Sequence, residues 1–225
     1  MTGIKVRSRW PRRQGPGGFS LLELLLALGL GLTLSGVILQ ALLADGQISL
    51  RLGRLVREKD NQRRTLALVQ LDLQRSLSVS PNPGAEVSPC GLAGRLPVLH
   101  LRTSAGAITY SVGAAPSGIW RGQVLMRCGP AFGLDGATNW ASAAQNRVVI
   151  DGLPLTPAVW RGCEGLVAAS SEATVDLAQS SGKGFSACLD PATGLVALRL
   201  AQEFGGGTNQ QRMESEQLVA PAEGA

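Results

Sequence analysis

Residues 18–44 read GFSLLELLLALGLGLTLSGVILQALLA, and this stretch decides the architecture of the chain. Between Leu24 and Leu39 no side chain is charged. The polar side chains there are those of Thr33 and Ser35, whose hydroxyls can hydrogen-bond to a carbonyl of their own helix. A helix needs roughly 17–25 apolar residues to cross a bilayer. The stretch therefore predicts a transmembrane helix over residues 19–44.

The basic residues of the chain are unevenly distributed. The 225 residues include 21 Lys and Arg against 16 Asp and Glu, a net charge of +5. The whole excess lies ahead of Phe19, where no acidic residue occurs: Lys5, Arg7, Arg9, Arg12 and Arg13. By the positive-inside rule, this leader stays in the cytoplasm and the chain after Asp45 lies on the outer side. The remainder is neutral overall, so nucleic acid is not an expected partner.

Glu23 is the charged residue near the front of the apolar run. A carboxylate at the centre of a bilayer costs about 2.5–3.5 kcal/mol on insertion scales, so an acid there needs an explanation. A secretory signal peptide does not supply one, because the apolar run exceeds the usual ~7–15 residues and the small-x-small pattern fails before Ala41 and Ala44. An uncleaved signal anchor explains the span and its orientation, but neither Glu23 nor the glycine pair before Phe19.

The sequence GFSLLELLLALGL, with a short basic stretch ahead of it, resembles the N-terminal cleavage and methylation signature of type IV prepilins and type II secretion pseudopilins. The resemblance implies that residues 1–18 are a leader, removed when a prepilin peptidase cuts between Gly18 and Phe19 on the cytoplasmic side and methylates the new amine of Phe19. Glu23 then becomes the fifth residue of the mature chain, where the family has its glutamate. The implied partners are the prepilin peptidase, other pilin or pseudopilin subunits, and the assembly platform of the inner membrane.

The chemistry of the cut end gives Glu23 a role. Cleavage leaves a positively charged amine on Phe19 at the edge of the hydrocarbon, where an uncompensated charge is costly. When neighbouring helices are staggered along their axes, Glu23 of one subunit can face the amine of the next, and one contact neutralises both. Dehydration of the two ions offsets much of the gain, so the main effect of the pair would be to set register. We predict that Glu23 is an assembly residue.

A second helical pattern follows the apolar run. Apolar residues recur at steps of three and four on either side of the polar stretch RLVREKDNQRR: Ile48, Leu52, Leu55, Leu66, Val69 and Leu73. They predict an amphipathic helix over residues 45–80 whose apolar stripe packs on the chain's own domain. A coiled-coil partner is the alternative, but Lys59 and Gln62 interrupt the seam. The run SPNPG, residues 80–84, ends the helix because proline cannot continue it.

From residue 85 to 204 short apolar stretches alternate with Gly, Pro, Ser and Asn, which predicts a β-rich domain. LPVLHLRT and AITYSV are expected to form a hairpin, and GIWRGQVLMRC, RVVIDGL and LVALRLAQ are further expected strands. The patterning of residues 106–155 resembles the β-domain of PilW-like minor pilins and of the J-type minor pseudopilin. Residues 205–225 are poor in large apolar side chains and are predicted to be a flexible tail. The expected fold class is α+β, a long N-terminal helix packed on an antiparallel sheet.

The four cysteines, Cys90, Cys128, Cys163 and Cys188, all lie on the predicted outer side, and none is in a CxxC motif. Zinc would need closer spacing or histidine partners, so disulfides in an oxidising periplasm are predicted and a metal site is not. Three pairings are possible. We expect Cys90 with Cys128 and Cys163 with Cys188, because each bridge would then close a loop-rich half; free buried thiols are the alternative.

No catalytic motif stands out in the sequence. His100, the single histidine, can be drawn with Ser104 and Asp135 as a triad, but no nucleophile elbow supports it, and a hydrogen-bonded strand histidine is expected. Neither a phosphate-binding glycine loop nor a calcium loop is present, so neither enzymatic activity nor a cofactor is predicted. The tryptophans beyond the leader are expected to be core or interface anchors: Trp120, Trp140 and Trp160.

Residues and resemblance together predict a minor pilin or pseudopilin, a structural subunit that after cleavage and N-methylation joins a type IV pilus or a type II secretion pseudopilus, in its initiation or tip-proximal complex. Such a chain sits in the bacterial inner membrane as a single-pass protein with a cytoplasmic N-terminus, and then in the periplasm or a cell-surface filament. The alternative is an uncleaved, single-pass, signal-anchored periplasmic binding module, which would keep residues 1–18.

Overall fold

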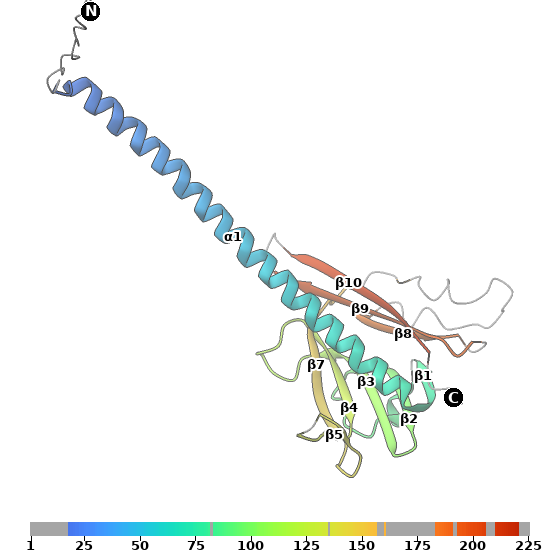
Figure 1. The fold of residues 1–225 in the computed structure, drawn as a ribbon. Coiled ribbons are helices and arrows are strands. Elements are labelled where there is room, and N and C mark those ends of the chain that lie inside the picture. Colours follow the sequence, from blue (N-terminus) through green and yellow to red (C-terminus); the bar gives the residue numbers. More distant parts are fainter. Residues whose placement is uncertain are drawn as a thin grey trace, which may run out of the picture. The chain divides into compact units, whose positions relative to one another are not determined.

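The C-terminal part of a long helix supplies the surface on which the strands pack. In the computed structural model, which describes residues 18–81, 83–134, 136–156, 160, 183–190, 193–205 and 210–220, this helix is α1, Leu21–Gln74. The chain divides into two units after residue 55, and the described strands all belong to the second unit, residues 56–225 (Figure 1). The predicted α+β class, with a long N-terminal helix and antiparallel sheets, is confirmed.

The described strands form three antiparallel sheets. Their orders are β1-β2-β3-β4-β7, β10-β9-β8 and β5-β6. The bounds, with the short 3-10 helix η1, are β1 Ser76–Pro81, η1 Ala85–Val87, β2 Leu96–Thr103, β3 Gly106–Ala114, β4 Gln123–Gly129, β5 Ala131–Phe132, β6 Thr138–Asn139, β7 Gln145–Leu153, β8 Phe185–Leu189, β9 Val196–Phe204 and β10 Gln211–Val219. The predicted hairpin is β2 and β3, and the segments RVVIDGL and LVALRLAQ lie in β7 and β9, as expected.

The core of the second unit lies between the helix and the strands. Leu66, Val69 and Leu73 of α1 are buried, so this half of the predicted apolar stripe packs on the chain's own domain, whereas Leu52 of the other half is 56% exposed. Their core neighbours come from several strands: Val98, Leu99 and Leu101 of β2, Ile108, Tyr110 and Val112 of β3, and Val196, Leu198 and Leu200 of β9. Burying such side chains contributes roughly 1.5–3 kcal/mol each. The helix and both large sheets therefore share one hydrophobic core.

The helix is shorter than predicted. It ends at Gln74, whereas the sequence predicted helix over residues 45–80, and Ser76–Pro81 form strand β1. The Ser76 hydroxyl donates to the carbonyl oxygen of Leu73 at 2.7 Å, which satisfies an acceptor at the helix end. The sequence SLSVSP then alternates with a period of two and pairs with β2, so pairing with the sheet prevails over continued helix.

The predicted flexible tail is wrong for residues 211–219. Gln211–Val219, within the tail predicted over 205–225, form β10, which pairs with β9 from end to end; residues 206–209 and 221–225 lie outside the described residues. Two polar side chains of β10 bond to α1. Ser215 donates to the Gln62 side chain at 2.7 Å, and Gln217 donates to that of Gln70 at 2.6 Å. Low hydrophobicity therefore misled the prediction, because this strand is held by hydrogen bonds.

Two smaller expectations also differ from the structure. The strand predicted from GIWRGQVLMRC begins at Gln123, because Ser117 accepts a turn hydrogen bond from the Trp120 amide and Gly122 has a φ of 57°. Strand β8, FSACL, was not predicted. It is buried on both faces along most of its length, and a short continuous run of this kind lacks the alternation that marks a half-buried strand.

A buried ion pair fastens the end of α1 to the middle of the first sheet. Arg127 of β4 donates to both carboxylate oxygens of Asp72, from Nε at 2.7 Å and from Nη2 at 3.3 Å. The Tyr110 hydroxyl of β3 donates to the same carboxylate at 2.6 Å, and Arg127 also donates to the carbonyl oxygen of Pro130 at 3.0 Å. All three side chains are at most 2% exposed. Burial, and then the adjacent Asp72 charge, raises the pKa of Tyr110, which keeps this donor protonated.

The ion pair predicts a large effect of a single substitution. Asp72→Ala leaves the Arg127 guanidinium buried without its counter-ion, so the free energy of unfolding of the domain should fall by about 3–5 kcal/mol. Urea denaturation of the full chain in detergent micelles, followed by tryptophan fluorescence, measures this loss. Asp60→Ala is the matched control, because Asp60 is exposed on the same helix and surface changes usually stay within about 0.5 kcal/mol. Equal midpoints for the two variants would contradict a structural role for the pair.

Candidate functional site

The first turn of α1 carries a reciprocal pair of hydrogen bonds. The backbone N–H of Glu23 donates to the Ser20 hydroxyl at 3.2 Å, and the backbone N–H of Ser20 donates to Oε2 of Glu23 at 3.3 Å. Ser20 is the residue before the helix and Glu23 its third residue, so the two form a capping box. A carboxylate in the first turn also interacts favourably with the positive end of the helix dipole. Glu23 therefore already has a partner within its own chain.

The predicted cleavage site lies directly ahead of this cap. Gly18, Phe19 and Ser20 precede the helix without regular secondary structure, and the Phe19 side chain is 87% exposed. A Cβ added at Gly18 would meet no atom of the chain within 4 Å. Nothing in the described fold thus requires a glycine at position 18. The structure places Gly18, Phe19 and Glu23 within one turn of the start of the helix at Leu21, two residues after the predicted start.

Ser20 is the residue of this segment that sequence reasoning missed. The signal was available, because Ser followed three residues later by Glu at the head of an apolar run is the sequence pattern of a capping box. The resemblance had assigned Glu23 to a contact between subunits. The cap does not exclude that contact, since Oε1 of Glu23 has no hydrogen-bond partner among the described residues.

The apolar part of α1 is long enough to span a membrane. Its most apolar 18-residue window has a mean hydropathy of 2.1, and none of that window is buried inside the chain. The leucines and other large apolar side chains from Phe19 to Leu43 are each more than half exposed. The Thr33 hydroxyl donates to the carbonyl oxygen of Leu30 at 2.9 Å, as expected for a polar side chain in an apolar helix. By length and composition, this helix is the candidate membrane span of the chain.

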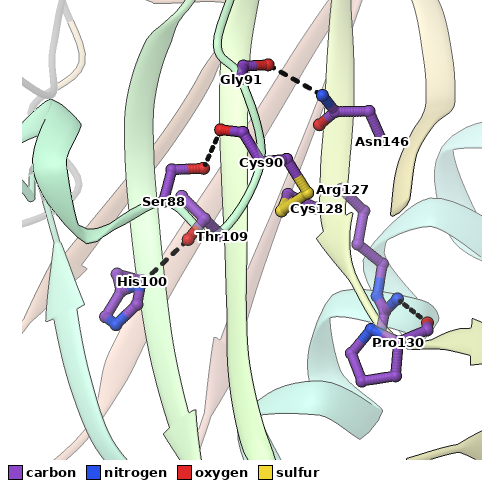
Figure 2. Close-up of a disulfide and its surroundings, with 9 residues drawn as sticks. All are labelled: Ser88, Cys90, Gly91, His100, Thr109, Arg127, Cys128, Pro130 and Asn146. Carbon is purple, nitrogen blue, oxygen red and sulfur yellow. Dashed lines mark hydrogen bonds between the residues drawn. A yellow bond between two sulfur atoms is a disulfide. The ribbon is translucent and has the colours of Figure 1, made fainter. Parts of the chain in front are cut away.

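The first predicted disulfide is confirmed. Cys90, in the loop after η1, is bonded to Cys128 of β4, with their Cα atoms 5.9 Å apart (Figure 2). The same loop is held by a hydrogen bond of 2.8 Å from the Asn146 amide of β7 to the carbonyl oxygen of Gly91. Cys188 is also disulfide-bonded, and Cys163, its predicted partner, lies outside the described residues. The second pairing stays a prediction.

His100 is hydrogen-bonded within the sheet, as expected. Its Nδ1 lies 2.9 Å from the Thr109 hydroxyl of the neighbouring strand, and the residue is 8% exposed (Figure 2). Burial, with a smaller contribution from the charge of Arg102, lowers the pKa of His100. Ser104 is in the turn between β2 and β3, and Asp135 lies outside the described residues. The structure therefore brings no triad together among the residues it describes.

A second polar cluster links α1 to the strands. Arg121 donates to Glu58 of α1 at 3.0 Å and approaches Asp151 of β7 at 3.5 Å. The Gln202 amide of β9 donates to the other oxygen of Glu58 at 3.1 Å and to the carbonyl oxygen of Asp151 at 3.1 Å. The hydrogen bond to Glu58 raises the pKa of Arg121 against the opposing effect of burial. The carboxylates of Glu58 and Asp151 are hydrogen-bonded to neighbouring side chains, so we interpret the cluster as a structural link between the helix and the sheets.

Among the described residues, no group of three or more His, Cys, Asp or Glu side chains is placed to hold a metal ion. The residues that the sequence singled out thus fall into two places: the start of the apolar helix, and the disulfide-linked β-domain. No family model, curated protein or solved structure matches this chain.

The capping box predicts a local change in the first turn of α1. Ser20→Ala removes the acceptor of the Glu23 amide, so hydrogen exchange of that amide should accelerate about fivefold, equivalent to the ~1 kcal/mol typical of a lost cap. Exchange of the full chain in detergent micelles, resolved by NMR, measures it. Ser35→Ala is the control, because Ser35 lies in the middle of the same helix. The same rate at Glu23 in both variants would rule out the cap.

Proposed function

We propose that this chain is a minor pilin or pseudopilin, a structural subunit that is cleaved after Gly18, methylated at Phe19, and built into a type IV pilus or a type II secretion pseudopilus. The observation that carries the proposal is the position of the Gly18–Phe19 bond. It lies in exposed, non-helical chain directly ahead of an apolar helix whose first turn holds Glu23. A peptidase needs its substrate bond outside regular structure, and this bond meets that requirement.

The open space at Gly18 supports an external reason for that glycine. The fold of the described residues tolerates a side chain at Gly18, so packing does not require the glycine there, whereas a peptidase that recognises this residue would. The five basic residues of the leader keep this bond on the cytoplasmic side. Processing thus requires a peptidase that acts at the cytoplasmic face of the inner membrane, after which the mature chain starts at the capped end of α1.

Glu23 then performs two tasks in sequence. In the free subunit it caps its own helix through Oε2, while Oε1 stays available. Cleavage adds a positive amine at Phe19, beside the positive end of the helix dipole, where a second positive charge is unfavourable. In the filament the Glu23 carboxylate of one subunit faces the amine of a neighbour, which neutralises both charges and sets the axial register. The function is assembly, without catalysis.

The second unit fits a domain that works outside the cytoplasm. A disulfide between Cys90 and Cys128 forms and persists in an oxidising compartment such as the periplasm. The partners of the chain in this proposal are other subunits of the filament, in its initiation or tip-proximal complex, and the inner-membrane assembly platform. The alternative, a signal-anchored periplasmic binding module, shares the span and the domain and differs in keeping its leader.

Processing is tested by the N-terminal mass of the chain purified from native membranes. We expect the chain to start at Phe19 with a methylated amine, and Gly18→Leu to retain residues 1–18, because the added side chain blocks the peptidase and not the fold. Gly31→Leu is the matched control, since a side chain there also meets open space but lies outside the cleavage signature. A wild-type chain that still begins at Met1 would establish the signal anchor in its place.

Assembly is tested by separating the two tasks of Glu23. Glu23→Gln removes the charge but keeps a side chain that can complete a capping box, whereas Ser20→Ala removes the cap but keeps the charge. Incorporation into the sheared filament fraction, relative to the membrane fraction, should fall about tenfold or more for Glu23→Gln, because the neighbour's amine is left uncompensated. Ser20→Ala should incorporate nearly normally. Equal loss in both variants would mean that Glu23 acts through the cap alone.

A further inference from the structure

A cleft with a volume of about 400 Å³ lies within the second unit, between α1 and β7. On the helix it is lined by Asn61, Arg64, Thr65 and Leu68, whose spacing of three and four places them on one helix face. On the strand it is lined by the consecutive residues 147–151. Side chains of consecutive residues point to opposite faces of a sheet, so a cleft lined by all five reaches the edge of β7.

That edge is open along residues 147–150. β7 is the last strand in the order β1-β2-β3-β4-β7, so its far side pairs with no strand of that sheet. Beyond residues 147–150, the Gly152 amide donates to the carbonyl oxygen of Arg121 at 2.7 Å. Gly152 also lies close to β9, since a Cβ there would approach the Glu203 carbonyl oxygen to 3.0 Å. Ahead of this point, alternate N–H and C=O groups of β7 face the cleft, where they are free to pair with another strand.

The cleft has an excess of positive charge. Arg147 lies directly opposite Arg127 in the β4–β7 pairing, and like charges in this position repel. Arg127 is neutralised by Asp72, whereas Arg147 donates to the neutral Gln145 side chain at 3.3 Å. Arg64, across the cleft, has no acidic partner among the described residues either. Asp151, the acid of the lining, is engaged by Arg121.

Aromatic side chains complete the lining. Trp120 is 36% exposed, and Phe132 lies under the Arg127 guanidinium, 4.8 Å from it. Trp and Arg are the residues most enriched at the energetic centres of protein interfaces. An open strand edge, unneutralised arginines on both walls and an exposed indole are together the features of a site that binds an extended acidic peptide through its backbone.

We propose that this cleft binds an extended, acidic segment of another polypeptide as an added strand on β7. Its backbone pairs with residues 147–150, and its carboxylates at alternate positions meet Arg64 and Arg147. A helical ligand would leave the strand edge unpaired. A second copy offering β10 fits poorly, because Glu214 is engaged by Arg199 and Arg212, and Glu216 by Trp160. The site does not depend on cleavage at Gly18, since the uncleaved chain has the same cleft.

Binding of defined peptides to the full chain in detergent micelles tests the proposal. The probe is a fluorescent ten-residue amide that alternates glutamate with valine, and the lysine–valine peptide is its charge control. Two further probes carry N-methyl groups on alternate backbone nitrogens. One is methylated at its odd-numbered residues and the other at its even-numbered residues. An added strand turns the N–H groups of one of these two sets toward β7. Fluorescence anisotropy should therefore show that methylating this set weakens the affinity about tenfold or more, and that methylating the other set weakens it less than about twofold.

Charge is tested in the same assay. Arg147→Glu and Arg64→Glu should each weaken binding of the glutamate peptide about tenfold, and Arg102→Glu, an exposed arginine of β2 outside the cleft, should leave it unchanged. Equal binding of the two methylated probes, or of the lysine peptide, would overturn strand addition. Absence of binding would overturn the proposal, as would concentration-dependent dimerisation of the chain that Arg147→Glu abolishes, because the occupant would then be a second copy. None of these outcomes depends on whether Phe19 is the N-terminus.

Discussion

The contact between Asp72 and Arg127 determines how the helix and the first sheet fit together. Asp72 lies in the last turn of α1, and Arg127 lies in β4 at the centre of the pairing with β3 and β7. A shift of β4 by one residue would turn Arg127 to the other face of the sheet and leave two charges buried without partners. Hydrophobic burial supplies most of the stability, but it tolerates such shifts better than a buried bidentate ion pair does. The pair therefore selects one register.

The polar stretch that interrupts the apolar stripe of α1 has the same character. Glu58 and Gln62 lie in this polar stretch, and yet they are 6% and 0% exposed. Glu58 receives hydrogen bonds from Arg121 and Gln202, and Gln62 bonds to both the backbone and a side chain of β10. The helix therefore contacts the strands through apolar side chains near its C-terminal end and through hydrogen-bonded polar side chains in the turns before it. Each buried polar group is tolerated because a specific partner satisfies it.

Periodicity explains what could be predicted from the sequence. The apolar helix, its packed face at Leu66, Val69 and Leu73, and the strands with clear alternation all follow from patterns that act over a few residues. The missed features depend on distant partners. No local pattern joins Asp72 to Arg127. The segment of β10 looked disordered because it is poor in large apolar residues, and the glutamines of α1 that bond to its Ser215 and Gln217 are distant in the sequence. At the N-terminus, the start of the helix was foreseen and the Ser20 cap was overlooked, although both are local.

The closure of β10 on α1 has a consequence for the order of events in biosynthesis. Gln62 and Gln70 are hydrogen-bonded to Ser215 and Gln217, which lie 153 and 147 residues further along the chain. β9 in turn needs β10 to cover one of its edges. These contacts form only after nearly the whole polypeptide has been synthesised, and closing such long loops is slow. Until then the glutamines and an open strand edge are exposed to solvent, so the domain is complete only once its last strand is in place.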